Sequence, residues 1–158
     1  MKRLTQLLMV LATAVLLTAC GVSDKKSFTQ LQTVVVETNT KMMATQADVM
    51  KKASAGDLSS LASMGPELDQ FMTGQLAKVE AIDATDKTRD LKEKMVAFFK
   101  YEQDMARTVF PKFAKITKDM SPTEINKIIG EVKGEMDMEQ KLLQSVNTAN
   151  QAALKLIQ

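Results

Sequence analysis

Residues 121–132 read SPTEINKIIGEV, and this stretch points most directly to the fold class. Ser121 and Glu124 form the capping-box pattern of a helix start, and Pro122 stands at the first helical position, where its missing N–H costs nothing. Apolar residues then return at helical spacing as far as the C-terminus. The predicted apolar face consists of Ile125, Ile129, Val132, Met136, Leu143, Val146, Ala153 and Ile157.

The segment before residue 57 predicts another long helix. Ser27 and Gln30 fit a second capping box, with Ser27 as the N-cap. An apolar face then recurs at alternating steps of three and four to about residue 52, and Gly56 is placed to end the helix in a left-handed conformation. That face consists of Phe28, Leu31, Val35, Thr38, Met42, Thr45 and Val49.

Two further helices are predicted between these. One covers residues 58–82 and is interrupted at Pro66, which cannot donate a backbone hydrogen bond to the preceding turn. The other begins near residue 86 and is kinked or split at Pro111. Because short loops make neighbouring helices antiparallel, the sequence predicts an all-α fold over residues 27–158: an elongated up-down-up-down four-helix bundle. The alternative is three long helices with kinks at Pro66 and Pro111.

Composition argues against most enzyme chemistry. The chain has no His and one Cys, Cys20. Imidazole bases, Ser-His-Asp and Cys-His nucleophiles, and most zinc and haem sites are therefore excluded. We expect no catalytic residue, cofactor or metal site.

The 12 methionines invite one exception, because thioether sulfur is a ligand of Cu(I). The pairs Met42-Met43 and Met136-Met138 are the candidates for a Cu(I) site. Methionine more commonly fills gaps in helical cores, and Met42, Met95, Met105 and Met136 fall on predicted apolar faces, so core packing is favoured.

Polar residues at or near the predicted helix seams form the second group of candidates. Such residues either set the register of the helices or line a small pocket, and register is favoured. They are Thr38, Thr45, Glu102, Glu139 and Asn150. A frayed, more hydrated end of the bundle is the further alternative. Other acidic residues at helix starts or on polar faces are attributed to capping and solvation.

Two apolar or small-residue features have a core interpretation and a partner interpretation. Phe98, Phe99, Phe110 and Phe113 are interpreted as core, with a surface offered to a partner as the alternative. Gly130 and Gly134 are expected to weaken the last helix locally, and a close-contact patch for a partner is the alternative.

The N-terminus has the parts of an export signal. Lys2 and Arg3 precede an apolar run over residues 7–17, and the segment ends in Leu17-Thr18-Ala19-Cys20. This pattern resembles the lipobox of bacterial lipoproteins. The resemblance implies removal of residues 1–19 by cleavage between Ala19 and Cys20, lipidation of the Cys20 sulfur, and membrane attachment by acyl chains. Residues 20–26 are then the lipidated end and a short tether.

The same resemblance predicts a location in the cell envelope, and the net charge limits the classes of partner. Gly21 stands where an Asp would indicate retention in the inner membrane, so the outer membrane facing the periplasm is favoured over the inner membrane. Of the 21 basic residues, two lie in the leader, and the 19 others balance 19 acidic ones, which gives no reason to bind nucleic acid. The predicted function is non-catalytic: a protein-interaction, accessory or stress factor of the envelope. The alternatives are a carrier of a small apolar ligand in the bundle core and an immunity or exclusion lipoprotein.

Overall fold

The computed structural model describes residues 21–117 and 119–158, apart from the side chain of Met136. Within these residues it contains helices and no strand, which confirms the all-α class. The elements are α1 (Val22–Ser54), the 3₁₀ helix η1 (Ser59–Ser63), α2 (Met64–Glu80), α3 (Arg89–Thr108), the single turn α4 (Phe110–Phe113) and α5 (Pro122–Ile157).

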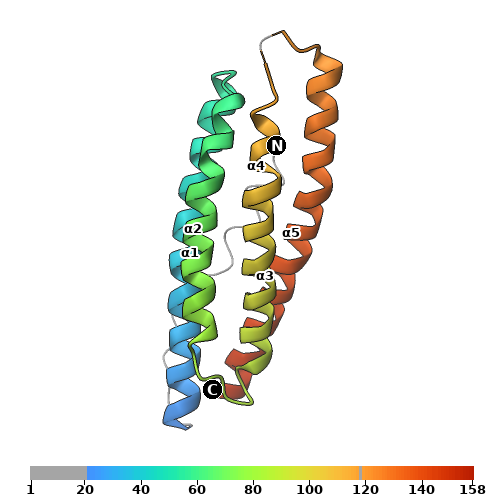
Figure 1. Cartoon of the computed structure of the whole chain (residues 1–158). Helices are drawn as coiled ribbons and strands as arrows, with labels where there is room; N and C mark the ends of the chain where they lie inside the picture. The colour runs from blue at the N-terminus through green and yellow to red at the C-terminus, as the bar shows by residue number, and fades with distance from the viewer. Residues whose placement is uncertain (1–20, 118) are drawn as a thin grey trace.

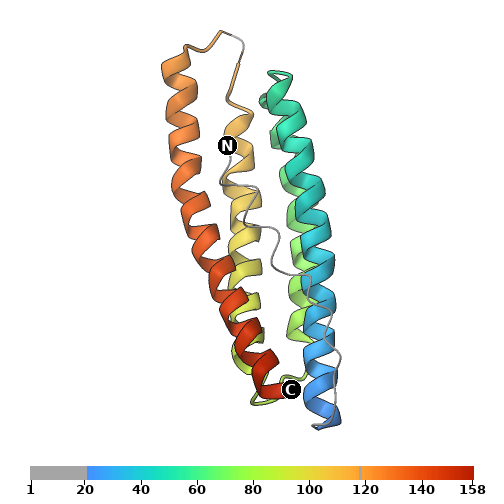
Figure 2. The same cartoon turned by 180° about the vertical axis from the view of Figure 1, so that it is seen from behind.

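The four long helices lie lengthwise beside one another (Figures 1 and 2). The start of α1, the loop between α2 and α3, and the C-terminus share one end of the molecule, here called the near end. The turn after α1 and the loop before α5 lie at the other, the far end. α3 is central, since α2 and α5 each make their most extensive contacts with it.

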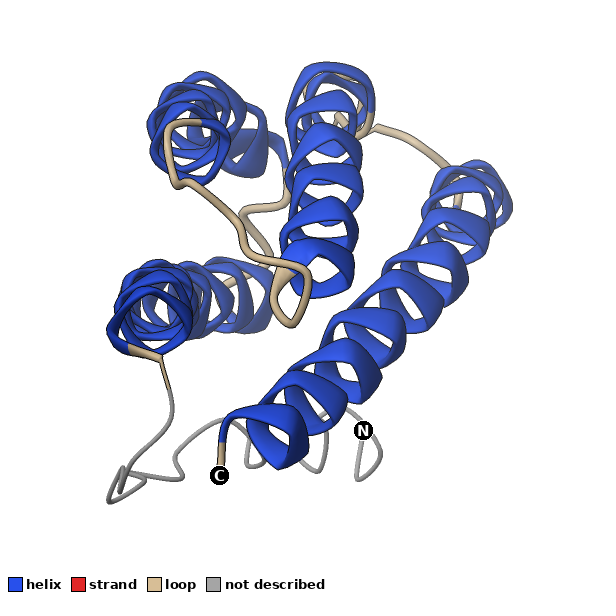
Figure 3. Ribbon diagram, turned by 90° about the horizontal axis from the view of Figure 1, so that it is seen from below, coloured by secondary structure: helices blue, strands red, loops and turns tan. Residues whose placement is uncertain are grey.

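The core occupies mainly the near half of the molecule. Its most deeply buried side chains come from all four long helices and include Leu31, Met72, Leu91, Met95 and Ile157. Figure 3 shows α5 inclined to the other helices, so that its last turns approach α1 and its first turns lie away from it. Apolar residues towards the far end are consequently less covered.

The start of α1 differs from the prediction. The helix begins at Val22, so most of the predicted tether, residues 22–26, is helical, and Ser27 is not an N-cap. Ser27 is buried, and its hydroxyl oxygen lies 2.8 Å from that of Thr88. Asp24 pairs with Lys87 at 3.2 Å. These two contacts hold the first turns of α1 against the loop between α2 and α3, which a local capping motif does not reveal.

The predicted breaks are present at both internal prolines. Pro66 lies in the first turn of α2, after the separate short helix η1, and Pro111 lies in α4, which follows the end of α3. Gly65 packs so closely on α3 that an added Cβ would lie 2.6 Å from the carbonyl oxygen of Ala106. A glycine at this position therefore permits the close approach of α2 to α3.

α5 begins as the sequence predicts. The Ser121 side chain accepts a hydrogen bond from the Glu124 backbone N–H at 3.3 Å, and Glu124 Oε2 accepts one from the Ser121 N–H at 2.8 Å. The predicted apolar face is only partly buried: Val146, Ala153 and Ile157 are in the core, whereas Ile129 is exposed. Helical spacing placed these residues on one face, but the inclination of α5 leaves the first part of that face uncovered.

Candidate functional site

The outward face of α1 carries a regular row of uncharged side chains. Starting at Val22, exposed positions recur at alternating steps of four and three residues to the end of the helix, and only Lys26 among them is charged. We call the uncharged members the α1 stripe. It consists of Val22, Thr29, Thr33, Val36, Thr40, Met43, Ala47, Met50 and Ser54.

The larger members of the stripe are well exposed. Val22 is 87% exposed, Val36 55%, Met43 55% and Met50 57%. Single exposed apolar residues are ordinary on protein surfaces. These four, with Thr29, are spaced by seven residues, which is the repeat of a helix that packs along a second helix. The spacing distinguishes the stripe from scattered apolar surface.

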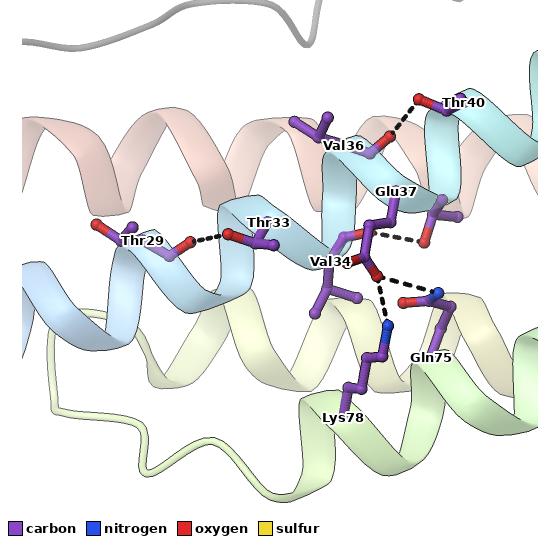
Figure 4. A network of polar contacts seen from close by, with 9 residues as sticks. Thr29, Thr33, Val34, Val36, Glu37, Thr40, Gln75 and Lys78 are labelled. Carbon is purple, nitrogen blue, oxygen red and sulfur yellow. Dashed lines mark hydrogen bonds and ion pairs between the residues drawn. The ribbon is translucent and has the colours of Figure 1, made fainter.

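The hydroxyls of Thr33 and Thr40, two of the three threonines in the stripe, are hydrogen-bonded within the helix. Thr33 Oγ1 donates to the carbonyl oxygen of Thr29, and Thr40 Oγ1 donates to that of Val36, each at 3.0 Å (Figure 4). Because each hydroxyl already donates to a backbone carbonyl, it can be removed from water without leaving its O–H group unpaired. These threonines are therefore suited to a dry contact.

Charged residues beside the stripe are directed to α2. Glu37 Oε2 accepts hydrogen bonds from Lys78 Nζ at 2.5 Å and from Gln75 Nε2 at 3.3 Å, and Figure 4 shows Val36 and Thr40 on the other side of α1. The Lys78 ammonium holds the pKa of Glu37 below its ordinary value. Lys41 forms an ion pair with Glu67 in the same way. The middle of α1 thus uses its charges for contacts with α2.

A second candidate is a carboxyl cluster between α3 and α5. Tyr101 Oη donates to the backbone carbonyl of Glu135 at 2.7 Å and to its Oε2 at 2.8 Å. On the same side of α3, the Glu102 side chain is only 2% exposed, and its Oε1 has no hydrogen-bond partner among the described residues. Glu139 on α5 is half-buried and close enough to act on the charge of Glu102.

Burial controls the protonation of this cluster. Loss of water, and then the neighbouring charge of Glu139, raises the pKa of Glu102 to about 8. Burial also raises the pKa of Glu139, and burial together with the hydrogen bond to Glu135 raises that of Tyr101. At neutral pH the cluster therefore retains a proton. Among the described residues, no group of three or more Cys, Asp or Glu side chains is arranged to hold a metal ion.

The other predicted seam residues serve helix contacts. Thr38 is buried and donates to the carbonyl of Val34 at 2.8 Å, and Asn150 joins α5 to α1 by accepting a hydrogen bond from Gln32. Thr45 is half-buried. The structure thus brings Glu102 and Glu139 together at one seam and places Thr38 and Asn150 at others.

Most of the aromatic and methionine candidates belong to the core. Phe98 and Phe99 are buried, and Phe110 packs against the core. Phe113 is half-buried, with its ring centre 6.4 Å from that of Phe110. Met95 and Met105 are buried, and Met42 packs against the core, as predicted. Met136 is predicted on the same faces, but its side chain lies outside the described atoms.

Gly130 and Gly134 are exposed, and an added Cβ at either would meet no atom within 4 Å. No close contact within the described structure uses them.

Two depressions on the described surface are open to solvent. One is lined by Ile82, Lys92 and Val96 among others, and a second by Lys94, Lys141 and Thr148 among others. Neither is lined by the methionines or phenylalanines that a carrier of apolar ligands would use.

The lipidation site predicted from the sequence, Cys20, and the cleavage residue Ala19 lie outside the described residues. The first described residue, Gly21, is the N-cap of α1. Among the described helices, none has a stretch long and apolar enough to cross a membrane. Comparison of the chain with protein-family models, with curated proteins and with solved structures finds no match.

The α1 stripe is not among the sites predicted from the sequence, although its periodic pattern is present there. The inward face of α1 and the stripe both follow steps of three and four, and the inward face contains Phe28 and Leu31. The stripe contains threonine, alanine and serine at five of its nine positions, so its average hydrophobicity is low. Only the structure shows that this second row is solvent-exposed along the whole helix.

Proposed function

We propose that this chain is a lipid-anchored protein of the bacterial envelope that acts by binding another protein through the α1 stripe and catalyses no reaction. The main support for this proposal is the stripe itself, an exposed, uncharged row with seven-residue spacing along a 33-residue helix. A solvent-exposed helix face normally carries charged side chains. A face that lacks them over most of its length is suited to a protein contact.

The anchor is the Cys20 sulfur, with the outer membrane facing the periplasm as the favoured location. Support comes from the leader and its lipobox. Because α1 begins at Val22, only Gly21 separates the lipidated residue from the first helical turn. In this arrangement the near end lies at the bilayer, and the stripe runs from it for about 50 Å, at 1.5 Å per residue.

The body that presents the stripe is, in this proposal, an elongated up-down-up-down four-helix bundle. The alignment of the long helices and the shared near-end core of Leu31, Met72, Met95 and Ile157 support this arrangement. A rigid near half would keep α1 at a fixed orientation to the membrane. An immunity or exclusion lipoprotein would be one case of the same binding function, in which the bound protein is an incoming effector.

Two experiments test the proposal in cells. For the anchor, radiolabelled palmitate enters the full chain and is absent from Cys20→Ala; equal labelling of both overturns the lipid anchor. For the binding face, a photo-crosslinking amino acid at Met43 yields a recurrent protein adduct, whereas the same probe at Lys100, exposed on α3, does not. Equal adducts from both positions, or none from Met43, contradict binding through the stripe.

A further inference from the structure

We infer that the occupant of the α1 stripe is the α1 stripe of a second copy of this chain, aligned in parallel and in register. This inference rests on the proposed function and adds the identity of the bound protein. It follows from the charge of the stripe, the size pattern of its side chains and the position of the anchor.

Charge is the first argument for a second copy. Two identical surfaces meet without repulsion only where each is neutral or pairs its own charges, and the nine stripe positions are uncharged. Lys26 is the only charged residue in the row, and it lies near the start of the helix, where its ammonium can reach water along its flexible stem. A strongly charged partner would find no counterpart on the stripe.

The residues beside the stripe also fit a parallel pair. Two borders flank the stripe, one along each of its edges. In a parallel pair of helices, each border of one stripe faces the opposite border of the other stripe. One border carries Lys25, Gln32, Asn39 and Gln46, and the other carries Gln30, Glu37, Ala44 and Lys51. With the five-residue offset between facing borders, Lys25 stands opposite the partner's Gln30 and Gln46 opposite the partner's Lys51, whereas Gln32 and Glu37 keep their contacts with Asn150 and Lys78 of their own chain. No like charges are opposed along these borders. Within the row the two Lys26 side chains face one another, and each can extend its ammonium into water.

Side-chain size gives the second argument. Along the stripe, the larger Val36, Met43 and Met50 alternate with the small Thr40, Ala47 and Ser54. In a parallel pair in register, each layer of the contact joins equal residues. Layers of Val36, Met43 and Met50, which supply the apolar contact, therefore alternate with layers of Thr40, Ala47 and Ser54, whose small side chains let the two helices approach. Since half the seam is small or carries a hydroxyl, it buries less apolar area than a leucine seam. We therefore expect a reversible association that depends on the shared membrane.

The anchor fixes the direction. Cys20 immediately precedes the N-cap Gly21, so two copies held in one bilayer have their near ends at the same level. Their α1 helices then run parallel, and equal residues face one another. Confinement to a surface also raises the effective concentration of one copy about the other, which favours a weak seam.

Disulfide trapping in cells tests the inference on the full chain. The sequence has no cysteine besides Cys20, so each added cysteine supplies a single new thiol. A disulfide requires Cα atoms within about 7 Å. We expect Met43→Cys and Met50→Cys each to give a disulfide-linked dimer, and Lys100→Cys, on the exposed side of α3, to give none.

The outcomes separate this inference from the proposed function. A dimer from Val36→Cys without one from Met50→Cys indicates antiparallel helices and overturns the parallel pair, because only residues near the middle of the stripe then meet themselves. Absence of any disulfide, with a photo-adduct at Met43 of another protein, overturns the second copy and leaves the binding function standing. Adducts of the Met43 probe with lipid alone overturn both, since the stripe then lies on the membrane.

Discussion

The Tyr101 hydroxyl on α3 bridges to α5 by donating to both the backbone carbonyl and the carboxylate of Glu135, at 2.7 and 2.8 Å. This is a direct polar link between α3 and the less covered first half of α5. It lies beside the buried Glu102 and the half-buried Glu139. The Tyr101 link and the buried carboxyl groups thus share one seam between α3 and α5.

Tyr101→Phe should loosen this link. It removes the donor from two acceptors and leaves the ring in place, so we expect a loss of about 1.5 kcal/mol in unfolding free energy, the lower end of the range for a hydrogen bond to a charged group. Amide exchange in the first half of α5 should quicken. Urea unfolding and hydrogen exchange measure these effects. Lys100→Ala, one position earlier and exposed, serves as the control, and equal small changes in both variants would argue against the bridge.

Glu102→Gln should make stability less dependent on pH. The folded pKa of Glu102, about 8, lies above its ordinary value of 4.5, so the folded protein holds an extra proton between these values. Its stability is therefore full below pH 4.5 and falls as pH rises towards 8, by up to about 1.4 kcal/mol per pH unit. Glutamine does not titrate, so the free energy of unfolding of the variant should increase relative to that of the native chain as pH rises.

Unfolding midpoints at pH 5, 7 and 9 measure the difference. The gap between the native chain and Glu102→Gln should be smallest at pH 5 and largest at pH 9. Glu93→Gln, exposed on the same helix, provides the matched control. A gap that does not change with pH would show that Glu102 is ionised in the folded protein throughout this range.

Gly65→Ala and Gly130→Ala should have opposite effects. At Gly65 the new methyl would lie 2.6 Å from the Ala106 carbonyl oxygen, so α2 and α3 must separate, and we expect a loss of about 1–3 kcal/mol. At Gly130 the methyl meets no atom, and alanine should stabilise α5 by about 1 kcal/mol through its helix propensity. Thermal unfolding of both variants decides the matter. Stabilisation by both would mean that α2 and α3 are less tightly packed at this crossing.

Much of the fold was predictable because its signals are local. The capping box at Ser121 and the breaks at Pro66 and Pro111 depend on backbone donors and ring geometry within a few residues. The start of α1 was not predictable in this way. Ser27 has the local sequence of an N-cap, but its contact with Thr88, 61 residues away, belongs to the tertiary structure.

The candidate sites were predictable only in part. Helical spacing placed Glu102 and Glu139 at a seam, but not the unpartnered oxygen of Glu102, which depends on what surrounds it. Spacing also gave Ile129 a place on an apolar face without showing that α5 leans away there. To predict the α1 stripe, one would have to know which of the two periodic rows on this helix points inward. Sequence periodicity defines faces, whereas packing decides what covers them.

The most direct test of the binding face combines one probe with one substitution on the stripe. A photo-crosslinking amino acid replaces Val36 in the full chain in cells, once with the native Met43 and once with the Met43→Glu substitution. Because Met43 is exposed, glutamate should leave the free energy of unfolding within about 0.5 kcal/mol of its native value while placing a charge in the proposed seam. We predict that the protein adduct from position 36 is lost in Met43→Glu. An undiminished adduct in the folded variant would contradict recognition through α1.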